Sequence, residues 1–218
     1  MPNRDYHQER REYDFTELSR DQLSSDPFIQ FSSWMDEAVG NKIIDPTAMS
    51  VATVDSNGQP HSRVVLLKES DEQGFVFYTH YDSDKGQQIE DNAKASLLFF
   101  WPQMDRQVRI EGSLEKIAVE QSENYFHSRP RDSQLAAASS TQSSVVPGRK
   151  TLEQNYAIQE ALYEHLDVKR PDHWGGYRLI PNRFEFWQGR PNRLHDRFIF
   201  TKCAVSNNQD WSIDRLAP

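Results

Sequence analysis

The chain has 218 residues, which is long enough for one large domain or two small ones with a real buried core. Its 25 Lys and Arg against 33 Asp and Glu give a formal net charge of 25 − 33 = −8, which argues against a general binder of nucleic acid or anionic membranes. The single cysteine, Cys203, excludes an intrachain disulfide, and we expect no metal site. The polar N-terminus and the short apolar runs predict a cytoplasmic protein.

Residues 1–25 are charged and lack a sustained apolar period, so we expect a mobile N-terminal arm with little core of its own. Residues 26–218 are expected to form a single domain. A helix is predicted to begin at Asp26-Pro27, where an N-cap precedes proline at the first helical position, and to end at Gly40-Asn41.

From Ala48 onward the pattern is typical of short strands closed by turn residues. The expected strands are 49–54, 61–68, 75–79, 95–101, 107–117, 176–180, 183–187, 194–201 and 211–216. The expected helices are 83–91, 119–127 and 152–166, with a hairpin turn at 55–60 and a loop at 136–147. This pattern predicts a mainly β protein with flanking helices, built as an antiparallel barrel or sandwich.

Residues 187–197 combine a tryptophan, three arginines and a histidine with a single acid, Asp196. In an extended segment, Arg193, His195 and Arg197 alternate and leave the strand on one face. Three such donors beside an aromatic ring suit a planar anionic ligand. A basic surface strand is the alternative, and local composition does not choose between the two.

Two other segments carry candidate anion donors. In a regular strand, Arg63 and Lys68 face opposite sides and could contact two anions, although an apolar strand with charged ends is commoner. Tyr125 and Arg129 share a helix face, and Pro130 either breaks that helix or starts a second one with Ser133 in its first turn. Such donors at a helix N-terminus describe a phosphate pocket, and helix capping explains them equally well.

The remaining candidates are weak when each is taken alone. Lys85 opens a short helix, and Gln142-Ser143 lies in a polar loop. Asp45 could be a functional carboxylate, but an Asp-Pro pair is more often a turn. The sequence has no P-loop, no Gly-x-Gly-x-x-Gly and no Gly-x-Ser-x-Gly, and its seven histidines form no His-x-x-x-His pair.

The order of these segments is more specific than any one of them. The chain contains, in order, Arg10-Arg11-Glu12-Tyr13, Asp45-Pro46-Thr47-Ala48-Met49, residues 63–68, Tyr125-Phe126-His127-Ser128-Arg129-Pro130-Arg131-Asp132-Ser133-Gln134, Trp174-Gly175-Gly176, Phe186-Trp187-Gln188-Gly189, Arg193-Leu194-His195-Asp196-Arg197 and Ile213-Asp214-Arg215-Leu216-Ala217-Pro218. From about residue 10 to its end, the chain resembles the pyridoxamine 5′-phosphate oxidase family, whose members use FMN to make pyridoxal 5′-phosphate.

The resemblance implies an FMN-binding split β-barrel and a homodimer with FMN at the subunit interface, the C-terminal region serving dimerisation and substrate binding. The residues it implies for FMN are Arg63, Val64, Val65, Leu66, Leu67, Lys68, Tyr78, Thr79, Lys85, Gln107, Gln142, Ser143, Trp187 and Arg197. Those it implies for the substrate are Arg10, Tyr13, Lys68, Tyr125, Arg129, Ser133, Arg193, Leu194 and His195. It places Arg193, His195 and Asp45 at the reacting part of the substrate.

The resemblance also implies the reaction, which belongs to vitamin B6 metabolism. Pyridoxamine 5′-phosphate or pyridoxine 5′-phosphate would lose a hydride from C4′ to flavin N5, and O2 would become H2O2. The amine substrate would also release NH3. Arg193 is expected to orient the ring and stabilise charge on it, and His195 to orient substrate or assist proton movement. The rival hypotheses are a split-barrel carrier or sensor of flavin or haem, and a pyridoxal phosphate carrier.

The sequence departs from the family at one position near the expected FMN phosphate. The family often has Ser-Arg-Lys where this chain has Ser83-Asp84-Lys85. Because an acid near a phosphate is repulsive, we expect either weaker FMN binding or compensation by Lys85 and Arg63. Residues 135–141 are also less aromatic than is usual in the family.

Overall fold

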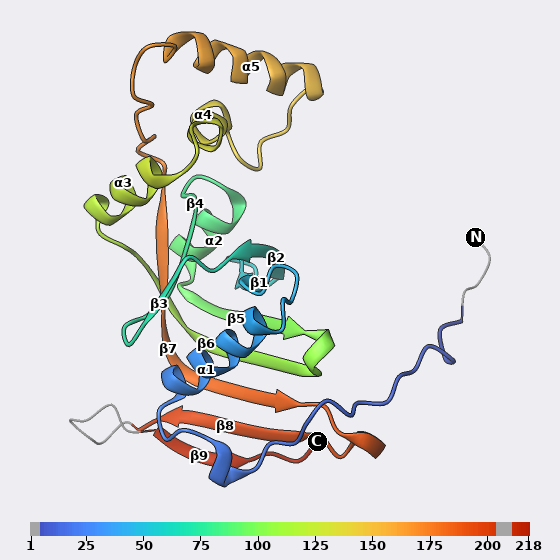
Figure 1. The fold of residues 1–218 in the computed structure, drawn as a ribbon. Coiled ribbons are helices and arrows are strands. Elements are labelled where there is room, and N and C mark those ends of the chain that lie inside the picture. Colours follow the sequence, from blue (N-terminus) through green and yellow to red (C-terminus); the bar gives the residue numbers. More distant parts are fainter. Residues whose placement is uncertain (1–4, 204–210) are drawn as a thin grey trace. The chain divides into compact units, whose positions relative to one another are not determined.

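The computed structural model describes residues 5–203 and 211–218 (Figure 1). In these residues the strands pair in the order β2-β1-β5-β6-β7-β4-β3, with β8 paired to β7 and β9 paired to β8. The strands are β1 (Ala48–Val54), β2 (Pro60–Leu66), β3 (Glu69–Asp71), β4 (Gly74–His80), β5 (Lys94–Trp101), β6 (Arg106–Lys116), β7 (Trp174–Gln188), β8 (Asp196–Lys202) and β9 (Trp211–Arg215). The predicted mainly β class is confirmed.

The helices flank this sheet as expected. They are α1 (Pro27–Gly40), α2 (Asp84–Asp91), α3 (Val119–Ser128), α4 (Arg131–Ser139) and α5 (Arg149–Leu162), with 3-10 turns at Arg20–Gln22, Pro102–Met104 and Pro191–Arg193. The predicted loop at 136–147 is wrong at its start, because the alanine-rich residues up to Ser139 continue α4. Asp26 caps α1 as predicted, its carboxylate accepting the Phe28 N–H at 2.8 Å.

The chain forms two compact units. In their described parts, unit 1 comprises residues 5–47, 98–110, 182–203 and 211–218, and unit 2 comprises Ala48–Leu97 and Glu111–Pro181. The strand β7 passes from one to the other at Pro181, where the sequence predicted a break between two strands. The strand continues because its pairing with β4 ends at Leu179 and its pairing with β8 begins at Arg183, so the proline lies outside both of these ladders.

In unit 1, the aromatic face of α1 forms the core. Phe31 packs edge-on against Phe99 with ring centroids 5.0 Å apart, and Trp34 packs against Phe186 at 5.3 Å. The N-terminal segment contributes as well, because Leu18 and Leu23 are buried. The expectation of little core in residues 1–25 is therefore wrong for this part of the segment.

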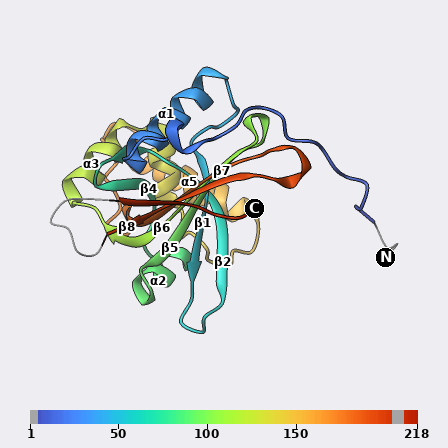
Figure 2. The same cartoon turned by 90° about the horizontal axis from the view of Figure 1, so that it is seen from below.

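In unit 2, β1 and β2 form the predicted hairpin (Figure 2), closed by the Asp55 N–H donating to the Gln59 carbonyl at 3.0 Å. A second cluster of buried residues lies under α3 and α4: Phe126, Leu135, Ala137, Val168 and Trp174. Figure 1 shows α3, α4 and α5 grouped together. The pairing of β4 with β7 sets Tyr78 opposite Gly176 and His80 opposite Trp174.

Candidate active site

Unit 2 contains a cavity of about 900 Å³, in which the candidate anion donors of three separate segments meet. Its lining includes Arg63, Val64, Val65, Leu66, Lys68, Tyr78, Thr79, His80, Asp84, Lys85, Tyr125, Arg129, Ser133, Gln142, Ser143 and Trp174. The sequence could not place these segments together, because they lie far apart along the chain and no local spacing relates them.

The N-terminal end of α2 supplies one group of donors. Lys85 Nζ donates to Thr79 Oγ1 at 2.9 Å and to Gln142 Oε1 at 2.7 Å. Burial, and then the charge of Arg63, lowers the pKa of Lys85 to about 8. A side chain at Gly86 would place its Cβ 1.8 Å from the Tyr81 carbonyl oxygen, so glycine allows this helix start to approach the preceding backbone.

The strand β2 supplies the second part of the lining. Arg63 donates to the Val51 carbonyl at 3.0 Å, to Thr53 at 2.6 Å and to Gln88 at 2.9 Å, which fixes its guanidinium against β1 and α2. The prediction that positions 63 and 68 face opposite sides is wrong. The strand β2 ends at Leu66, so its parity does not extend to Lys68, and both cations line the cavity.

The apolar residues at the end of β2 and directly after it differ in their exposure. The side chains of Val64 and Leu66 are 70% and 42% exposed and line the cavity. Such exposed apolar groups beside cations suit a ligand with a flat apolar part. The side chain of Leu67 is instead buried, so a contact of this residue with FMN would have to come from its backbone.

The junction of α3 and α4 supplies the third group of donors. Arg129 is extended before Pro130, and Ser133 lies in the first turn of α4, as predicted. The Arg129 guanidinium lies 4.8 Å from the centroid of the Trp174 ring. Among the described residues, its buried Nη1 has no hydrogen-bond partner, and burial lowers its pKa. An unsatisfied buried cationic donor is costly, so this end of the cavity favours an anion.

Unit 1 contains a separate cavity of about 650 Å³, lined by Glu9, Arg10, Arg11, Glu12, Tyr13, Arg190, Asn192, Arg193 and His195. The prediction that Arg193, His195 and Arg197 alternate along one strand is wrong. Arg193 lies in the 3-10 turn Pro191–Arg193 with φ of 62°, and β8 begins only at Asp196. The turn directs Arg193 and His195 to this cavity, while Leu194 is exposed.

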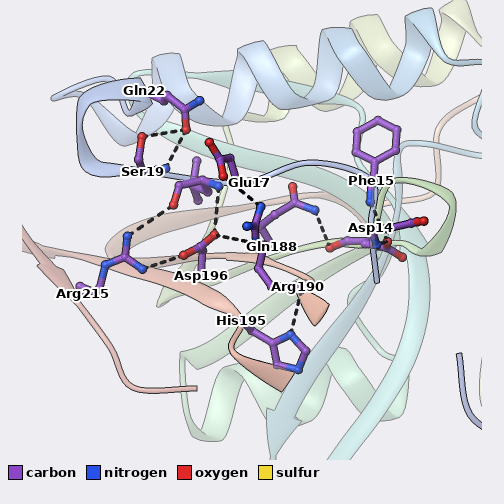
Figure 3. A network of polar contacts seen from close by, with 12 residues as sticks. Asp14, Phe15, Glu17, Ser19, Gln22, Gln188, Arg190, His195, Asp196 and Arg215 are labelled. Atoms are coloured by element: carbon purple, nitrogen blue, oxygen red, sulfur yellow. Dashed lines mark hydrogen bonds and ion pairs between the residues drawn. The ribbon is translucent and has the colours of Figure 1, made fainter. Parts of the chain in front are cut away.

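The network in Figure 3 fixes the position of His195 in unit 1. The Arg190 N–H donates to His195 Nδ1 at 3.1 Å, so the neutral imidazole carries its proton on Nε2. Burial, followed by the charges of Arg193 and Arg197, lowers the pKa of His195 and favours this neutral form. Tyr13 packs edge-on against His195, with ring centroids 5.4 Å apart, and against Trp187 at 5.6 Å.

Two carboxylates, those of Asp196 and Asp105, bind the backbone of the N-terminal segment at two places. Asp196 pairs with Arg215 at 2.7 Å (Figure 3). It also accepts the Leu18 N–H at 3.1 Å. Asp105 pairs with Arg11 at 2.6 Å and accepts the Asp14 N–H at 3.1 Å. Sequence reasoning missed Asp105, because its partners lie about ninety positions away and no local pattern signals them.

The other predicted residues of unit 1 lie outside the lining of the cavity. Arg197 is bound to the buried carboxylate of Glu185, with Nε and Nη2 each 2.8 Å from Oε1. Gln107 and Trp187 are half-buried on β6 and β7. Asp45 is exposed in a turn with φ of 50°. Their proposed roles stay predictions.

The antiparallel sheet with flanking helices is that of a split barrel, and its unit 2 cavity is lined by cations. Residues 35–158 match the family described as pyridoxamine 5′-phosphate oxidase, and residues 174–218 match the pyridoxine 5′-phosphate oxidase C-terminal dimerisation region. The chain belongs to the pyridoxamine 5′-phosphate oxidase family.

Individual relatives agree with this assignment. The chain is 60% identical over 219 residues to pyridoxine/pyridoxamine 5′-phosphate oxidase 1 of Hydrogenovibrio crunogenus, covering 100% of both chains. It is 49% identical over 205 residues to the chloroplastic pyridoxine/pyridoxamine 5′-phosphate oxidase 1 of Arabidopsis thaliana, and the match covers 93% of this chain and 38% of that protein. The crystal structure of PhzG from Burkholderia lata 383, in complex with tetrahydrophenazine-1-carboxylic acid, matches with a TM-score of 0.87 and 28% identity over 95% of this chain and 100% of that one.

Among the described residues, none of the helices has both the length and the apolar character needed to cross a membrane.

Proposed function

We propose that this chain is an FMN-dependent oxidase that converts pyridoxamine 5′-phosphate or pyridoxine 5′-phosphate to pyridoxal 5′-phosphate. The observation that carries this proposal is the pair of donor groups in the unit 2 cavity, one around Lys85 and one around Arg129. Two phosphorylated ligands, cofactor and substrate, need two such groups. Charge-assisted hydrogen bonds make each group specific for a phosphate despite the acidic chain.

The residues around α2 fit the phosphate of FMN. Lys85 provides a positive charge, and the side chains of Thr79, Gln142 and Ser143 provide hydrogen-bonding groups beside it. The exposed side chains of Val64 and Leu66 would lie along the flavin ring. When bound, FMN would supply the two-electron chemistry, accepting a hydride from substrate C4′ at N5 and being reoxidised by O2 with release of H2O2.

We assign the substrate phosphate to Tyr125, Arg129 and Ser133, with Lys68 as a further cation. The unsatisfied Arg129 Nη1 supports this assignment, because a phosphate oxygen would provide the missing acceptor. The ring of Trp174 under the guanidinium holds it in a plane, which favours bidentate contact.

In a homodimer with FMN at the subunit interface, we assign Arg193 and His195 to the ring of the substrate, with Arg10 and Tyr13 closing over it. His195 has its Nδ1 occupied by the Arg190 N–H, so its Nε2–H is a donor. This favours an orienting role over that of a general base. We also propose a homodimer, as the match of residues 174–218 to a dimerisation region suggests.

Oxygen uptake by the purified, FMN-loaded protein tests the proposed function. With pyridoxamine 5′-phosphate we expect O2 consumption, equimolar H2O2 and NH3, and formation of pyridoxal 5′-phosphate. With pyridoxine 5′-phosphate the same aldehyde should form without NH3. A yellow protein that binds these compounds without consuming O2 would be a carrier, and the proposal would be rejected.

We expect FMN to bind more tightly when Asp84 is replaced. Asp84 lines the cavity. Burial lowers the pKa of both Arg63 and Lys85, and the charge of Asp84 partly offsets this lowering, which indicates that it interacts with both cations. The repulsion between the Asp84 carboxylate and the FMN phosphate is partly screened by solvent. Removing it should lower the FMN dissociation constant about threefold in Asp84→Asn and about tenfold in Asp84→Arg. Asp82→Asn, a change at an exposed neighbouring acid, is the control. Equal affinities in fluorescence titrations of the apoproteins would show that Asp84 does not oppose FMN.

A further inference from the structure

Glu69, the first residue of β3, joins strand β4 to helix α3, which bears the proposed substrate-phosphate donor Tyr125. Its Oε1 accepts the hydroxyl of Tyr78 on β4 at 2.6 Å, and its Oε2 accepts Gln121 Nε2 on α3 at 2.6 Å. The side chain of Glu69 is half-buried and borders a third cavity, of about 500 Å³. It is not among the residues that line the 900 Å³ cavity of unit 2. One carboxylate therefore connects β4 to the helix that bears Tyr125.

The ring of Tyr78, which Glu69 holds, is in direct contact with Tyr125, one of the proposed hydrogen-bond donors to the substrate phosphate. Tyr78 stacks on Tyr125 with ring centroids 3.8 Å apart and planes 19° apart. Trp174 continues this stack at 5.5 Å from Tyr78, and the Arg129 guanidinium lies over Trp174 at 4.8 Å. The Tyr78 hydroxyl is used by Glu69, so Tyr78 acts on the donors through the face of its ring. Burial, and then the hydrogen bond to Glu69, raises the pKa of this hydroxyl, so Tyr78 stays protonated and remains a donor to the carboxylate.

We infer that Glu69 is a positioning residue for substrate binding: it fixes the Tyr78–Tyr125–Trp174 stack and so sets the geometry of Tyr125 and Arg129 toward the substrate phosphate. This inference rests on the proposed function. A carboxylate near a phosphate is electrostatically unfavourable, so any benefit of Glu69 to binding comes from geometry and opposes its charge. The two contributions can be separated, because glutamine keeps the acceptor for Tyr78 and removes the charge.

The test compares Glu69→Ala and Glu69→Gln in the FMN-loaded enzyme with pyridoxamine 5′-phosphate. For Glu69→Ala we expect KM to rise about tenfold with kcat within about twofold of wild type, since the hydrogen bonds of Tyr78 and Gln121 to the carboxylate are lost and the chemical step is not touched. For Glu69→Gln we expect KM equal to wild type or lower, because the amide oxygen accepts the Tyr78 hydroxyl and Gln121 can turn its amide to match. Glu72→Ala, at an exposed glutamate in the adjoining turn, is the matched control and should behave as wild type.

Tyr78→Phe supplies the second arm, because it removes the same hydrogen bond and keeps the ring. The double variant Glu69→Ala/Tyr78→Phe should raise KM less than the product of the two single effects. The inference would be overturned if Glu69→Ala had the KM of wild type, or if its kcat and kcat/KM fell by the same factor. A tenfold higher KM in Glu69→Gln would overturn it as well. These outcomes all require an active wild type, whereas failure of the proposed function appears as a wild type that consumes no O2.

Discussion

Arg193→Ala is expected to lower kcat about a hundredfold to a thousandfold while the FMN content of the purified protein stays that of wild type. The reason is that Arg193 does not line the unit 2 cavity to which we assign FMN, but lines the unit 1 cavity together with His195. A cation that meets charge developing on the substrate ring contributes mainly to the transition state, and loss of one such donor costs this much. Steady-state oxygen uptake and the flavin absorbance of the same samples measure the two quantities.

Two further variants sharpen this prediction. Arg193→Lys keeps the charge and loses the planar fork, so we expect activity between those of wild type and Arg193→Ala. Arg20→Ala removes an exposed arginine of unit 1 outside the lining of the cavity and controls for the loss of one positive charge. An Arg193→Ala protein with wild-type kcat, or one that has lost its FMN together with its activity, would contradict the assignment of Arg193 to the substrate ring.

Lys85→Met is expected to weaken FMN binding about tenfold to a hundredfold, the value of one charge-assisted hydrogen bond to a phosphate. Lys85 donates to Thr79 and Gln142. A phosphate bound among these three side chains would be stabilised by the positive charge of Lys85. Lys85→Arg keeps the charge and is the matched control. Fluorescence titration of apoprotein with FMN measures all three dissociation constants, and an unchanged constant in Lys85→Met would exclude a contact with the phosphate.

The pH dependence of FMN affinity follows from the lowered pKa of the same lysine. Without ligand, the pKa of Lys85 is about 8, and a bound phosphate raises it because the charged form is then favoured. The affinity is therefore constant below pH 8 and falls above it, by up to about tenfold for each pH unit, as the free protein loses the proton that the complex keeps. Titrations between about pH 7 and 9.5 avoid protonation of the phosphate, whose pKa is near 6. Lys85→Arg should show a flat profile, and a flat wild-type profile would contradict the prediction.

Local rules predicted the donors at the helix junction correctly. The restriction that Pro130 imposes on Arg129, and the placement of Ser133 in the following first turn, depend on neighbours in sequence only. The same rules explain the error at Arg193. Alternation requires an extended backbone, and Pro191-Asn192 instead forms a turn in which Asn192 and Arg193 adopt positive φ.

Contacts between segments that lie far apart in the sequence could not be predicted from local sequence patterns. Glu69 looks like an ordinary charged residue at a strand end, and its importance lies in Tyr78 and Gln121, 9 and 52 positions away. Arg197 belongs to a basic segment in sequence, yet its guanidinium is bound by Glu185, whose carboxylate β7 brings beside it. Strand register decides the Glu69–Tyr78 and Arg197–Glu185 contacts, and no pattern in one segment specifies the register of its partner.

A crystal structure of the protein grown with FMN and pyridoxal 5′-phosphate tests the central claim most directly. We expect the FMN phosphate at Lys85, Gln142 and Ser143, the vitamin phosphate at Tyr125, Arg129 and Ser133, and the side chains of Arg193 and His195 against the pyridine ring. Either phosphate bound away from these donors, or Arg193 and His195 directed into solvent far from both rings, would contradict the account.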